Sequence, residues 1–287
     1  MDPVIFMNRN FQKISVLGGG LLGGSIALAL GSEKRVALWF RKPEAVKSAR
    51  ELGLAHATGD LAEAVAGTEL LILAVPVGAM PDLLEKAIDA GLPADCLITD
   101  VGSVKQTPHR SLAPILEKSG NPFIGSHPMA GSEQNGLSAA RAGLFNNAAC
   151  LLTNDSAASS ELCAALEAFW KLLGCRTSWL GAAEHDTLVA RISHLPHVTA
   201  AATAKISLKD PAMGQFGGGG LRDTTRVASG NPVMWAEILT ENRDAIIPAL
   251  HETIAELREI LASLESPDQE LVHRWLSGAK ELRDTLP

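Results

Sequence analysis

The first 180 residues alternate between short apolar, β-rich runs and segments with a helical pattern. The runs are apolar at nearly every position, which is typical of strands in a parallel sheet covered by helices on both faces. Strands are predicted at 13–17, 35–40, 69–75, 96–101 and 122–126, and two more, at 149–153 and 175–180, extend the sheet. Helices are predicted at 21–30, 44–53, 80–90, 104–119 and 157–173. This alternation predicts a doubly wound, Rossmann-type α/β fold.

No strand pattern follows residue 180. Residues 183–207 predict a helix that kinks at Pro196, and the glycines of "GQFGGGG" (214–220) predict a flexible break. Further helices are predicted at 232–263, with an interruption near Pro248, and at 267–284. We therefore expect an α/β domain over 1–180 and an all-α domain over 181–287. A helical domain this elongated cannot bury its apolar faces alone, which favours a homodimer formed through it.

Composition excludes several classes of protein. Of the 287 residues, 46% are apolar and 20% are charged, the profile of a soluble globular chain. The net charge of −7 argues against nucleic acid or an anionic membrane as a partner. Neither a membrane span nor a signal peptide is recognisable, and the four scattered cysteines indicate reduced thiols. We expect a cytoplasmic location.

A glycine-rich loop follows the first predicted strand directly. In "SVLGGGLLGGSIALAL", Gly18, Gly20 and Gly23 match the pattern GxGxxG and open the first helix. The first glycine permits the turn, the second lets the backbone approach a pyrophosphate, and the third allows close packing of helix and strand. A purely structural turn is the alternative, but the strand–turn–helix context favours dinucleotide binding. Further candidate cofactor contacts are Leu21, Leu22, Val75 and Pro76.

The end of the second predicted strand bears on which nicotinamide dinucleotide binds. NAD enzymes place a carboxylate here, about 20 residues past the glycines, to bond the ribose hydroxyls. In "LWFRKPE", Phe40 takes that position, and Arg41 and Lys42 follow. The two cations can bind a 2′-phosphate, although solvated loop charges are the simpler interpretation of the pair. The missing acid favours NADP, with NAD as the alternative.

Two polar motifs follow later strands of the predicted sheet. "TDVGSVKQ" places Ser103 just past one strand, and "GSHPMAG" places His127 after another. Ligands of open α/β sheets bind beyond the carboxyl ends of the strands, where a nicotinamide would lie. Ser103 alone could equally cap a helix starting at Val104, and His127 alone could be an ordinary turn residue. Together they make a hydroxyl and imidazole pair that is a candidate for catalysis.

The second domain adds two motifs, "EHDTLVARISHLPH" and "GGGLRDTTRVASGNPVMW". His194 and His197 lie three residues apart on a predicted helix and face similar directions, but no third ligand indicates a metal site. Arg222 and Arg226 lie four apart, and on a helix they form a patch of two cations. Such a patch suits a substrate with two carboxylates, while a surface salt-bridge network is the alternative.

These motifs, with "GGGLLGGS", "DVGSVK" and "GSHPMAGSE", follow one another in the order and spacing of a known family. The chain resembles the prephenate/arogenate dehydrogenases of tyrosine biosynthesis over nearly its whole length. The resemblance implies an N-terminal dinucleotide domain, a helical dimerising domain and an active site between them.

The resemblance also implies roles for individual residues. His127 would be the catalytic histidine bonded to the ring hydroxyl of the substrate, and Ser103 would assist it on the nicotinamide side. Arg226 would bind a substrate carboxylate. The remaining positions expected to line the substrate pocket are His197, Ser132, Glu133, Arg222 and Trp235. The family often carries lysine where Arg222 stands, so the geometry of carboxylate binding can differ here.

The implied reaction is an NAD(P)-dependent oxidative decarboxylation of prephenate to 4-hydroxyphenylpyruvate, or of arogenate to tyrosine, with release of CO2. Two alternatives from the same residues are an NADP-dependent β-hydroxy acid dehydrogenase and a non-catalytic NADP-sensing protein. The first would be expected to use a lysine base on the helical domain. The second has no need for Ser103, His127 and Arg226 together.

Overall fold

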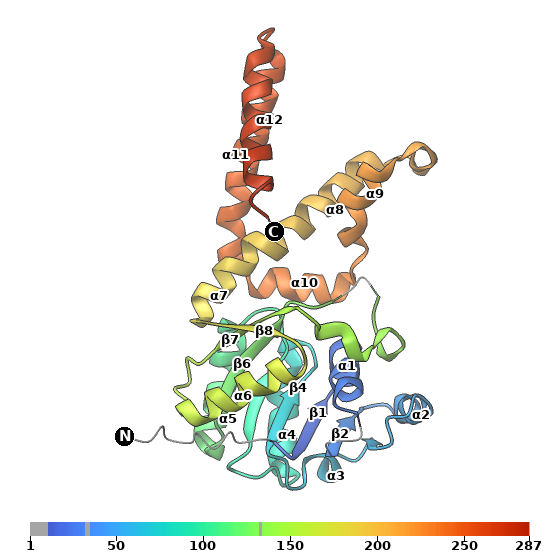
Figure 1. Ribbon diagram of the computed structural model, residues 1–287, viewed down its shortest axis with the longest axis vertical. Helices are drawn as coiled ribbons and strands as arrows, with labels where there is room; N and C mark the ends of the chain where they lie inside the picture. The colour runs from blue at the N-terminus through green and yellow to red at the C-terminus, as the bar shows by residue number, and fades with distance from the viewer. Residues whose placement is uncertain (1–10, 32–34, 132–133, 287) are drawn as a thin grey trace. The chain divides into compact units, whose positions relative to one another are not determined.

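The computed structural model describes residues 11–31, 35–131 and 134–286, and its strands form one sheet (Figure 1). The strand order is β3-β2-β1-β4-β5-β6-β7-β8, and only the pair β6–β7 is antiparallel among these described strands. The bounds are β1 Lys13–Leu17, β2 Arg35–Trp39, β3 Ala57–Thr58, β4 Leu70–Leu73, β5 Leu97–Asp100, β6 Phe123–Pro128, β7 Ala149–Thr153 and β8 Arg176–Leu180. The doubly wound fold predicted from the sequence is confirmed.

Helices follow most of the strands and continue after the sheet. Those among the strands are α1 Leu21–Leu30, α2 Pro43–Glu51, α3 Leu61–Val65, α4 Met80–Asp89, α5 Gln106–Ser119 and α6 Ser160–Leu172. After β8 come α7 Ala182–Val189, α8 Leu195–Ser207, α9 Gly219–Thr225, α10 Pro232–Glu241, α11 Arg243–Glu265 and α12 Gln269–Arg283. None of the helices in the described ranges is both long enough and apolar enough to cross a membrane.

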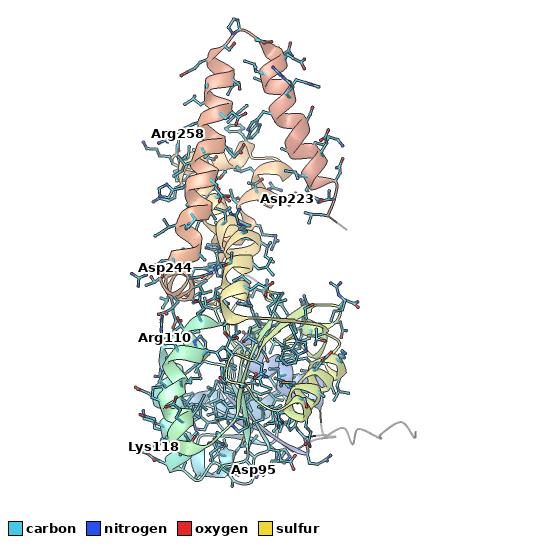
Figure 2. All side chains as sticks on the ribbon, turned by 90° about the vertical axis from the view of Figure 1, so that its left-hand side faces the viewer. Asp95, Arg110, Lys118, Asp223, Asp244 and Arg258 are labelled. Atoms are coloured by element: carbon cyan, nitrogen blue, oxygen red, sulfur yellow. The ribbon has the colours of Figure 1, made fainter. Side chains whose placement is uncertain are left out.

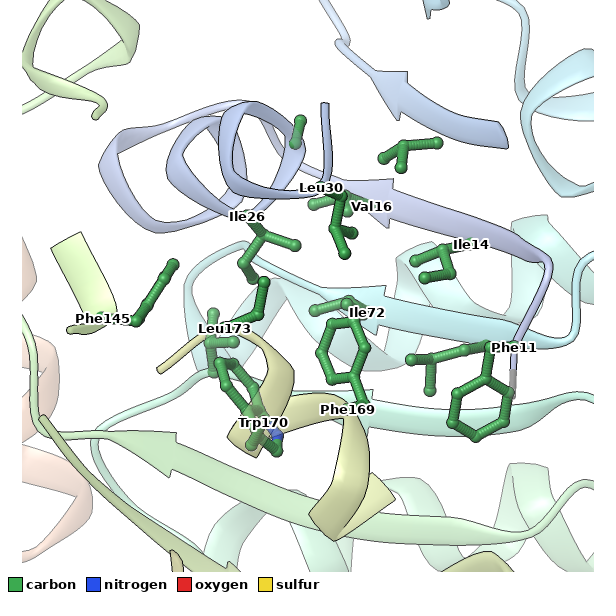
Figure 3. Close-up of a cluster of buried hydrophobic side chains, with 14 of the residues drawn as sticks. Phe11, Ile14, Val16, Ile26, Leu30, Ile72, Phe145, Phe169, Trp170 and Leu173 are labelled. Carbon is green, nitrogen blue, oxygen red and sulfur yellow. The ribbon is translucent and has the colours of Figure 1, made fainter. Parts of the chain in front are cut away.

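Two apolar layers hold the helices on the sheet. On one face, Ile26 of α1 and Phe169 and Trp170 of α6 pack over the central strands (Figure 3). On the other face, Leu84 of α4 and Leu112 of α5 pack on the same strands. Alternate side chains of a strand point to opposite faces, so the apolar runs supply both layers. The apolar runs of the strands therefore hold helices on both faces of the sheet.

Some predicted boundaries differ from the structure in the α/β part. β6 continues to Pro128, so His127 lies inside a strand rather than after it. α5 begins at Gln106 with Lys105 at the N-cap, so the alternative in which Ser103 caps this helix is wrong. β3 and α3 were not predicted because two and five residues are too short to show a period.

The helices after β8 also differ from the sequence prediction in several places. A π-helical turn, Ala190–His194, joins α7 to α8, so the irregularity lies just before Pro196 rather than at it. The predicted interruption near Pro248 is wrong, since this proline lies within α11. The helix breaks instead at Asn242, whose buried side chain bonds to the backbone carbonyl of Asp186. The glycine run is not a simple break either, because α9 begins inside it at Gly219.

The chain divides into two compact units, Met1–Asn242 and Arg243–Pro287. The second unit is a hairpin of α11 and α12, in which the Trp275 indole N–H donates to Glu256 at 3.1 Å. Several leucines of this hairpin are exposed, among them Leu257 at 59% and Leu261 at 55%. Exposed apolar side chains at this spacing leave one stripe of α11 uncovered within its unit.

Candidate active site

The glycine loop brings the ends of two strands into contact. Gly18 has a φ of +112°, a conformation that side chains disfavour. A Cβ at this position would lie 2.4 Å from the carbonyl oxygen of Ala74 and 2.9 Å from Val75. The loop after β1 therefore lies directly against the residues that follow β4. Val75 is half-buried at this contact and Pro76, the next residue, is exposed.

The other two glycines of the pattern have different surroundings. A Cβ at Gly23 would lie 1.9 Å from the Gly18 carbonyl oxygen, so α1 packs on the loop at a distance that only glycine permits. A Cβ at Gly20 would meet no atom within 4 Å, and Gly20 is the N-cap of α1 with no side chain capping it. Leu21 and Leu22 are half-buried in the first turn of this helix. The open N-terminus of α1 fits the pyrophosphate of a dinucleotide.

The end of β2 carries no carboxylate. Phe40 is buried, and its ring fills the space beside Gly19, where a Cβ would lie 2.1 Å from the ring. Arg41 and Lys42 are both exposed, and Lys42 is the N-cap residue of α2. The strand end therefore presents two cations and a buried aromatic ring to the place where the adenosine ribose binds in this fold.

Asp100, the last residue of β5, connects the two polar motifs. Its buried carboxylate accepts a hydrogen bond from the Gly102 N–H at 2.8 Å and one from the Ser126 N–H at 3.2 Å. It also forms a fully buried ion pair with Lys105. Gly102 and Ser126 directly precede Ser103 and His127, so one carboxylate ties together the loop and the strand that carry the two candidate catalytic residues. Ser103 is half-buried in that loop.

His127 is the first member of a buried chain of hydrogen bonds. Its side chain is 7% exposed, and its Nδ1 lies 2.8 Å from Nε2 of His185. Nδ1 of His185 in turn lies 2.8 Å from Oδ1 of Asp186. Burial holds the pKa of His127 well below its ordinary value of 6.5, and nearby His185 and Lys105 lower it further. His127 is therefore a neutral imidazole near neutral pH, able to accept a proton.

Two further histidines lie along the helices that follow. The His197 ring stacks on Trp235, with ring centroids 3.5 Å apart and planes 9° from parallel. The His194 ring lies edge-on to the same indole, with ring centroids 6.1 Å apart. His194 and His197 therefore face the same side chain, as their three-residue spacing predicted. Nδ1 of His194 lies 3.0 Å from Nδ2 of Asn242, which also donates to the Asp186 carbonyl oxygen at 2.8 Å. A continuous set of contacts thus joins Trp235 to the hydrogen-bond chain of His127.

Burial dominates the electrostatics of these two rings. It lowers the pKa of His194 to about 4 and lowers the pKa of His197 as well. Nε2 of His194 and Nδ1 of His197 are buried atoms with no hydrogen-bond partner among the described residues. Buried polar atoms without partners are costly, which makes both rings candidates for contact with a ligand. Across the described ranges, no group of His, Cys, Asp and Glu side chains has the arrangement of a metal site.

The two arginines lie on separate turns rather than on one helix. Arg222 is in the last turn of α9, and Arg226 opens a 3₁₀ turn, Arg226–Ser229. Both side chains are exposed. This turn packs on α8, the helix that carries His197. Ser132 and Glu133, the other expected substrate contacts, lie outside the described residues.

α10 is tied to the carboxyl edge of the sheet at two points. Glu237 accepts a hydrogen bond from the Gly78 N–H at 2.7 Å, and Glu241 accepts one from the Thr107 hydroxyl at 2.8 Å. Gly78 follows β4, and Thr107 lies in the first turn of α5. Figure 1 shows α10, the helix that contains Trp235, crossing above the ends of the strands.

The sequence did not indicate the buried polar residues that surround His127. His185 and Asp186 fall inside the motif "EHDTLVARISHLPH", and Asp100 and Lys105 fall inside "TDVGSVKQ", but none of them was assigned a role. The one signal was an adjacent His–Asp pair in a predicted helix. A contact across 58 residues leaves no trace in local periodicity.

Two family models match the chain in succession. The model described as the nucleotide-binding domain of prephenate dehydrogenase matches residues 26–178, and its dimerization domain matches residues 181–278. Prephenate dehydrogenase of Bacillus subtilis is 35% identical over 98% of this chain and 78% of the relative. Cyclohexadienyl dehydrogenase of Zymomonas mobilis is 33% identical over 95% of both chains.

Solved structures agree with these relatives. Prephenate dehydrogenase of Aquifex aeolicus, in complex with hydroxyphenyl propionate and NAD+, superposes with a TM-score of 0.82 at 27% identity, covering 95% of this chain and 97% of its own. Synechocystis arogenate dehydrogenase superposes with a TM-score of 0.76 at 31% identity, covering 95% and 99%. The glycine loop and the buried histidine thus stand in a chain similar throughout to these enzymes. The chain belongs to the prephenate/arogenate dehydrogenase family, and it is an NAD(P)-dependent oxidoreductase.

Proposed function

We propose that the protein oxidises and decarboxylates prephenate or arogenate with His127 as the general base. The observation that carries this assignment is the buried, neutral imidazole of His127, which is hydrogen-bonded through Nδ1 to His185. Nε2 is the nitrogen proposed to meet the substrate. Ser103 is proposed to assist on the nicotinamide side. Such a base is suited to take the proton of a hydroxyl group while hydride leaves the carbon that bears this hydroxyl.

The proposed reaction needs only one proton acceptor from the protein. A dinucleotide whose pyrophosphate is held by the glycine loop would supply its nicotinamide as the hydride acceptor. Nε2 of His127 accepts the proton of the C4 hydroxyl, and the O–H electron pair forms the C4 carbonyl. As CO2 leaves C1, the electrons of that C–C bond enter the ring and make it aromatic. The oxygen on C4 becomes a phenolate and takes the proton back from His127, so the base is restored at the end of each cycle.

The substrate is proposed to lie between His127 and the residues around Trp235. Arg226 is proposed to bind one substrate carboxylate in a two-point contact, which orients C4. Arg222, His197, Trp235, Ser132 and Glu133 are proposed as the remaining pocket residues. Support comes from the buried Nδ1 of His197, which has no partner among the described residues, and from the turn of Arg226 packed on the same helix.

For the cofactor, we propose a preference for NADP over NAD. Gly18, Gly20, Gly23, Leu21, Leu22, Val75, Pro76 and Ser103 are the proposed contacts that both dinucleotides share. The preference is supported by exposed Arg41 and Lys42 beside buried Phe40, with no carboxylate at the end of β2 to bond the free 2′-hydroxyl of NAD or repel a phosphate. Parallel titrations with NAD+ and NADP+ test it, and tighter binding of NAD+ would contradict it.

A homodimer through the helical domain is proposed as the assembly. Its support is the exposed stripe of Leu257, Leu261 and Leu264 on α11. The domain boundary near residue 180 and the cytoplasmic location stay predictions.

One assay tests the proposed function directly. Purified protein is mixed with NADP+ or NAD+ and with prephenate or arogenate, and NAD(P)H formation is followed by absorbance. Turnover of either substrate is expected, and His127→Asn should lower kcat by about 10²–10⁴-fold while substrate binding largely survives. No turnover of either substrate under conditions where the cofactor binds would exclude the assignment. A near-normal kcat for His127→Asn would show that the base is another group.

A further inference from the structure

Asp186 is a buried carboxylate that caps a helix from outside that helix. Its Oδ1 accepts a hydrogen bond from the Lys105 N–H at 2.7 Å, and its Oδ2 accepts one from the Gln106 N–H at 3.0 Å. These are the first backbone donors of α5, whose N-terminal end is marked by Arg110 and whose C-terminal end is marked by Lys118 in Figure 2. The carboxylate thus caps the N-terminus of the 14-residue α5, although Asp186 itself lies in α7.

The surroundings keep Asp186 ionised. Burial by itself raises the pKa of this carboxyl, but the hydrogen bonds from His185 and from the two backbone N–H groups outweigh it and hold the pKa below its ordinary value. The dipole of α5 favours a negative charge at the same point. The buried Lys105 ammonium is already paired with Asp100, so Asp186 takes its hydrogen bonds from the helix and from His185.

An ionised Asp186 decides where the protons of both histidines lie. A carboxylate can only accept, so Nδ1 of His185 carries the proton of that 2.8 Å bond. Burial lowers the pKa of His185, so this ring is neutral. Its Nε2 is then an acceptor, and the 2.8 Å bond to His127 requires the proton to be on Nδ1 of His127. This leaves Nε2 of His127 as the unprotonated nitrogen. Each step is forced by the one before it.

We propose that His185 and Asp186 are positioning residues that hold His127 in the Nδ1–H tautomer, with Nε2 free to accept the substrate proton. The role of this pair deepens the proposed function and rests on it. A neutral imidazole has two tautomers, and only one presents a lone pair at the nitrogen opposite His185. The pair also fixes the plane of the His127 ring, because a hydrogen bond to a fully buried partner permits little rotation.

A structural role alone is the competing explanation, in which the pair only attaches α7 to the edge of the sheet. Two substitutions of His185 separate the explanations. An asparagine places its amide near the position of Nδ1, so it can bond Asp186 but cannot reach His127. A glutamine places its amide near the position of Nε2, and its oxygen can accept the Nδ1–H of His127. His109→Gln is the matched control, since this histidine is hydrogen-bonded to Thr153 and Ser156 and has no part in the hydrogen bonds that link His127, His185 and Asp186.

The first readout is the tautomer of His127, which does not depend on turnover. Nitrogen-15 NMR of histidine-labelled protein distinguishes the two tautomers, and the signals that vanish in His127→Asn identify this ring. We expect the Nδ1–H form in the wild type and in His185→Gln, and a loss of that preference in His185→Asn. An Nε2–H tautomer in the wild type would overturn the proposal.

The second readout is the division of the effect between kcat and KM. His185→Asn should lower kcat at least about tenfold, a part of the roughly 10²–10⁴-fold contribution of a general base, and leave KM nearly unchanged. His185→Gln should recover most of this loss, and His109→Gln should behave as the wild type. Equal loss in both His185 variants, or wild-type kcat in His185→Asn, would overturn the proposal. If the wild type turns over neither substrate, the proposed function fails, while the tautomer still decides the role of the pair.

Discussion

The protonation of His127 sets the lower pH limit of the proposed reaction. Burial lowers the pKa of this ring well below 6.5, with further lowering by His185 and Lys105. The base must be neutral, so activity is present above the lowered pKa and is lost as the pH falls through it. We expect the acid limb of the pH profile of kcat/KM to lie clearly below 6.5. An acid limb at or above that pH would show that the titrating base is not a buried histidine.

Arg226 should act mainly through binding. If its guanidinium holds a substrate carboxylate, Arg226→Ala removes a charge-assisted hydrogen bond worth about 1.5–3 kcal/mol, and KM should rise about 10–100-fold. The effect on kcat should be smaller, because the interaction is made in the ground state as well. Steady-state kinetics with the preferred substrate measure both constants. A fall in kcat at unchanged KM would assign Arg226 to the chemical step instead.

At the scale of elements, the glycine loop can be tested by two matched substitutions. Gly20→Ala should fold normally, because its methyl group meets no protein atom within 4 Å, but it should weaken cofactor binding about tenfold by occupying the space of the pyrophosphate. Gly23→Ala places a Cβ 1.9 Å from a backbone oxygen and should reduce the free energy of unfolding by about 1–3 kcal/mol.

Thermal unfolding and cofactor titration of the two variants provide the measurements. A Gly20→Ala protein that binds the dinucleotide as tightly as the wild type would remove the pyrophosphate from this loop. A fully stable Gly23→Ala protein would mean that α1 can move away from β1 without cost.

Elements with a clear local pattern were predictable, and those made by distant contacts were not. The strand at 149–153 was predicted to the residue, and the glycine loop was placed between β1 and α1, because period and turn chemistry are written in neighbouring residues. β3 is too short to show a period. Asn242, at the end of α10, forms buried hydrogen bonds to Asp186 of α7 and to His194 of the π-helical turn, and such contacts between distant segments show no local pattern.

The candidate site divides in the same way. The glycines, Ser103 and His127 could be proposed from the sequence because each lies in a short motif at the end of a predicted strand. The His185–Asp186 pair was quoted within a motif but not assigned, since its purpose appears only when α7 is placed against the start of α5. Local sequence therefore indicated the proposed base but not the residues proposed to set its tautomer.

At the scale of the whole molecule, the exposed leucines of α11 should mark the dimer contact. Replacing both Leu257 and Leu261 by glutamate should shift the protein toward monomers, because charges on a desolvated apolar surface are costly. Arg258→Glu, an exposed position on the same helix, is the control for added negative charge. Light scattering after size-exclusion chromatography gives the mass. A wild-type monomer, or a dimer unaffected by the double substitution, would place the contact elsewhere or remove it.

In the proposed reaction, oxidation at C4 is coupled to loss of the carboxylate at C1. Counting both products of one reaction measures this coupling: CO2 released from substrate labelled in that carboxylate, and NAD(P)H formed by the wild-type protein. We expect equal amounts of the two products throughout the reaction with prephenate or arogenate. NAD(P)H formed without CO2 would indicate a simple alcohol dehydrogenase and rule out the proposed decarboxylation.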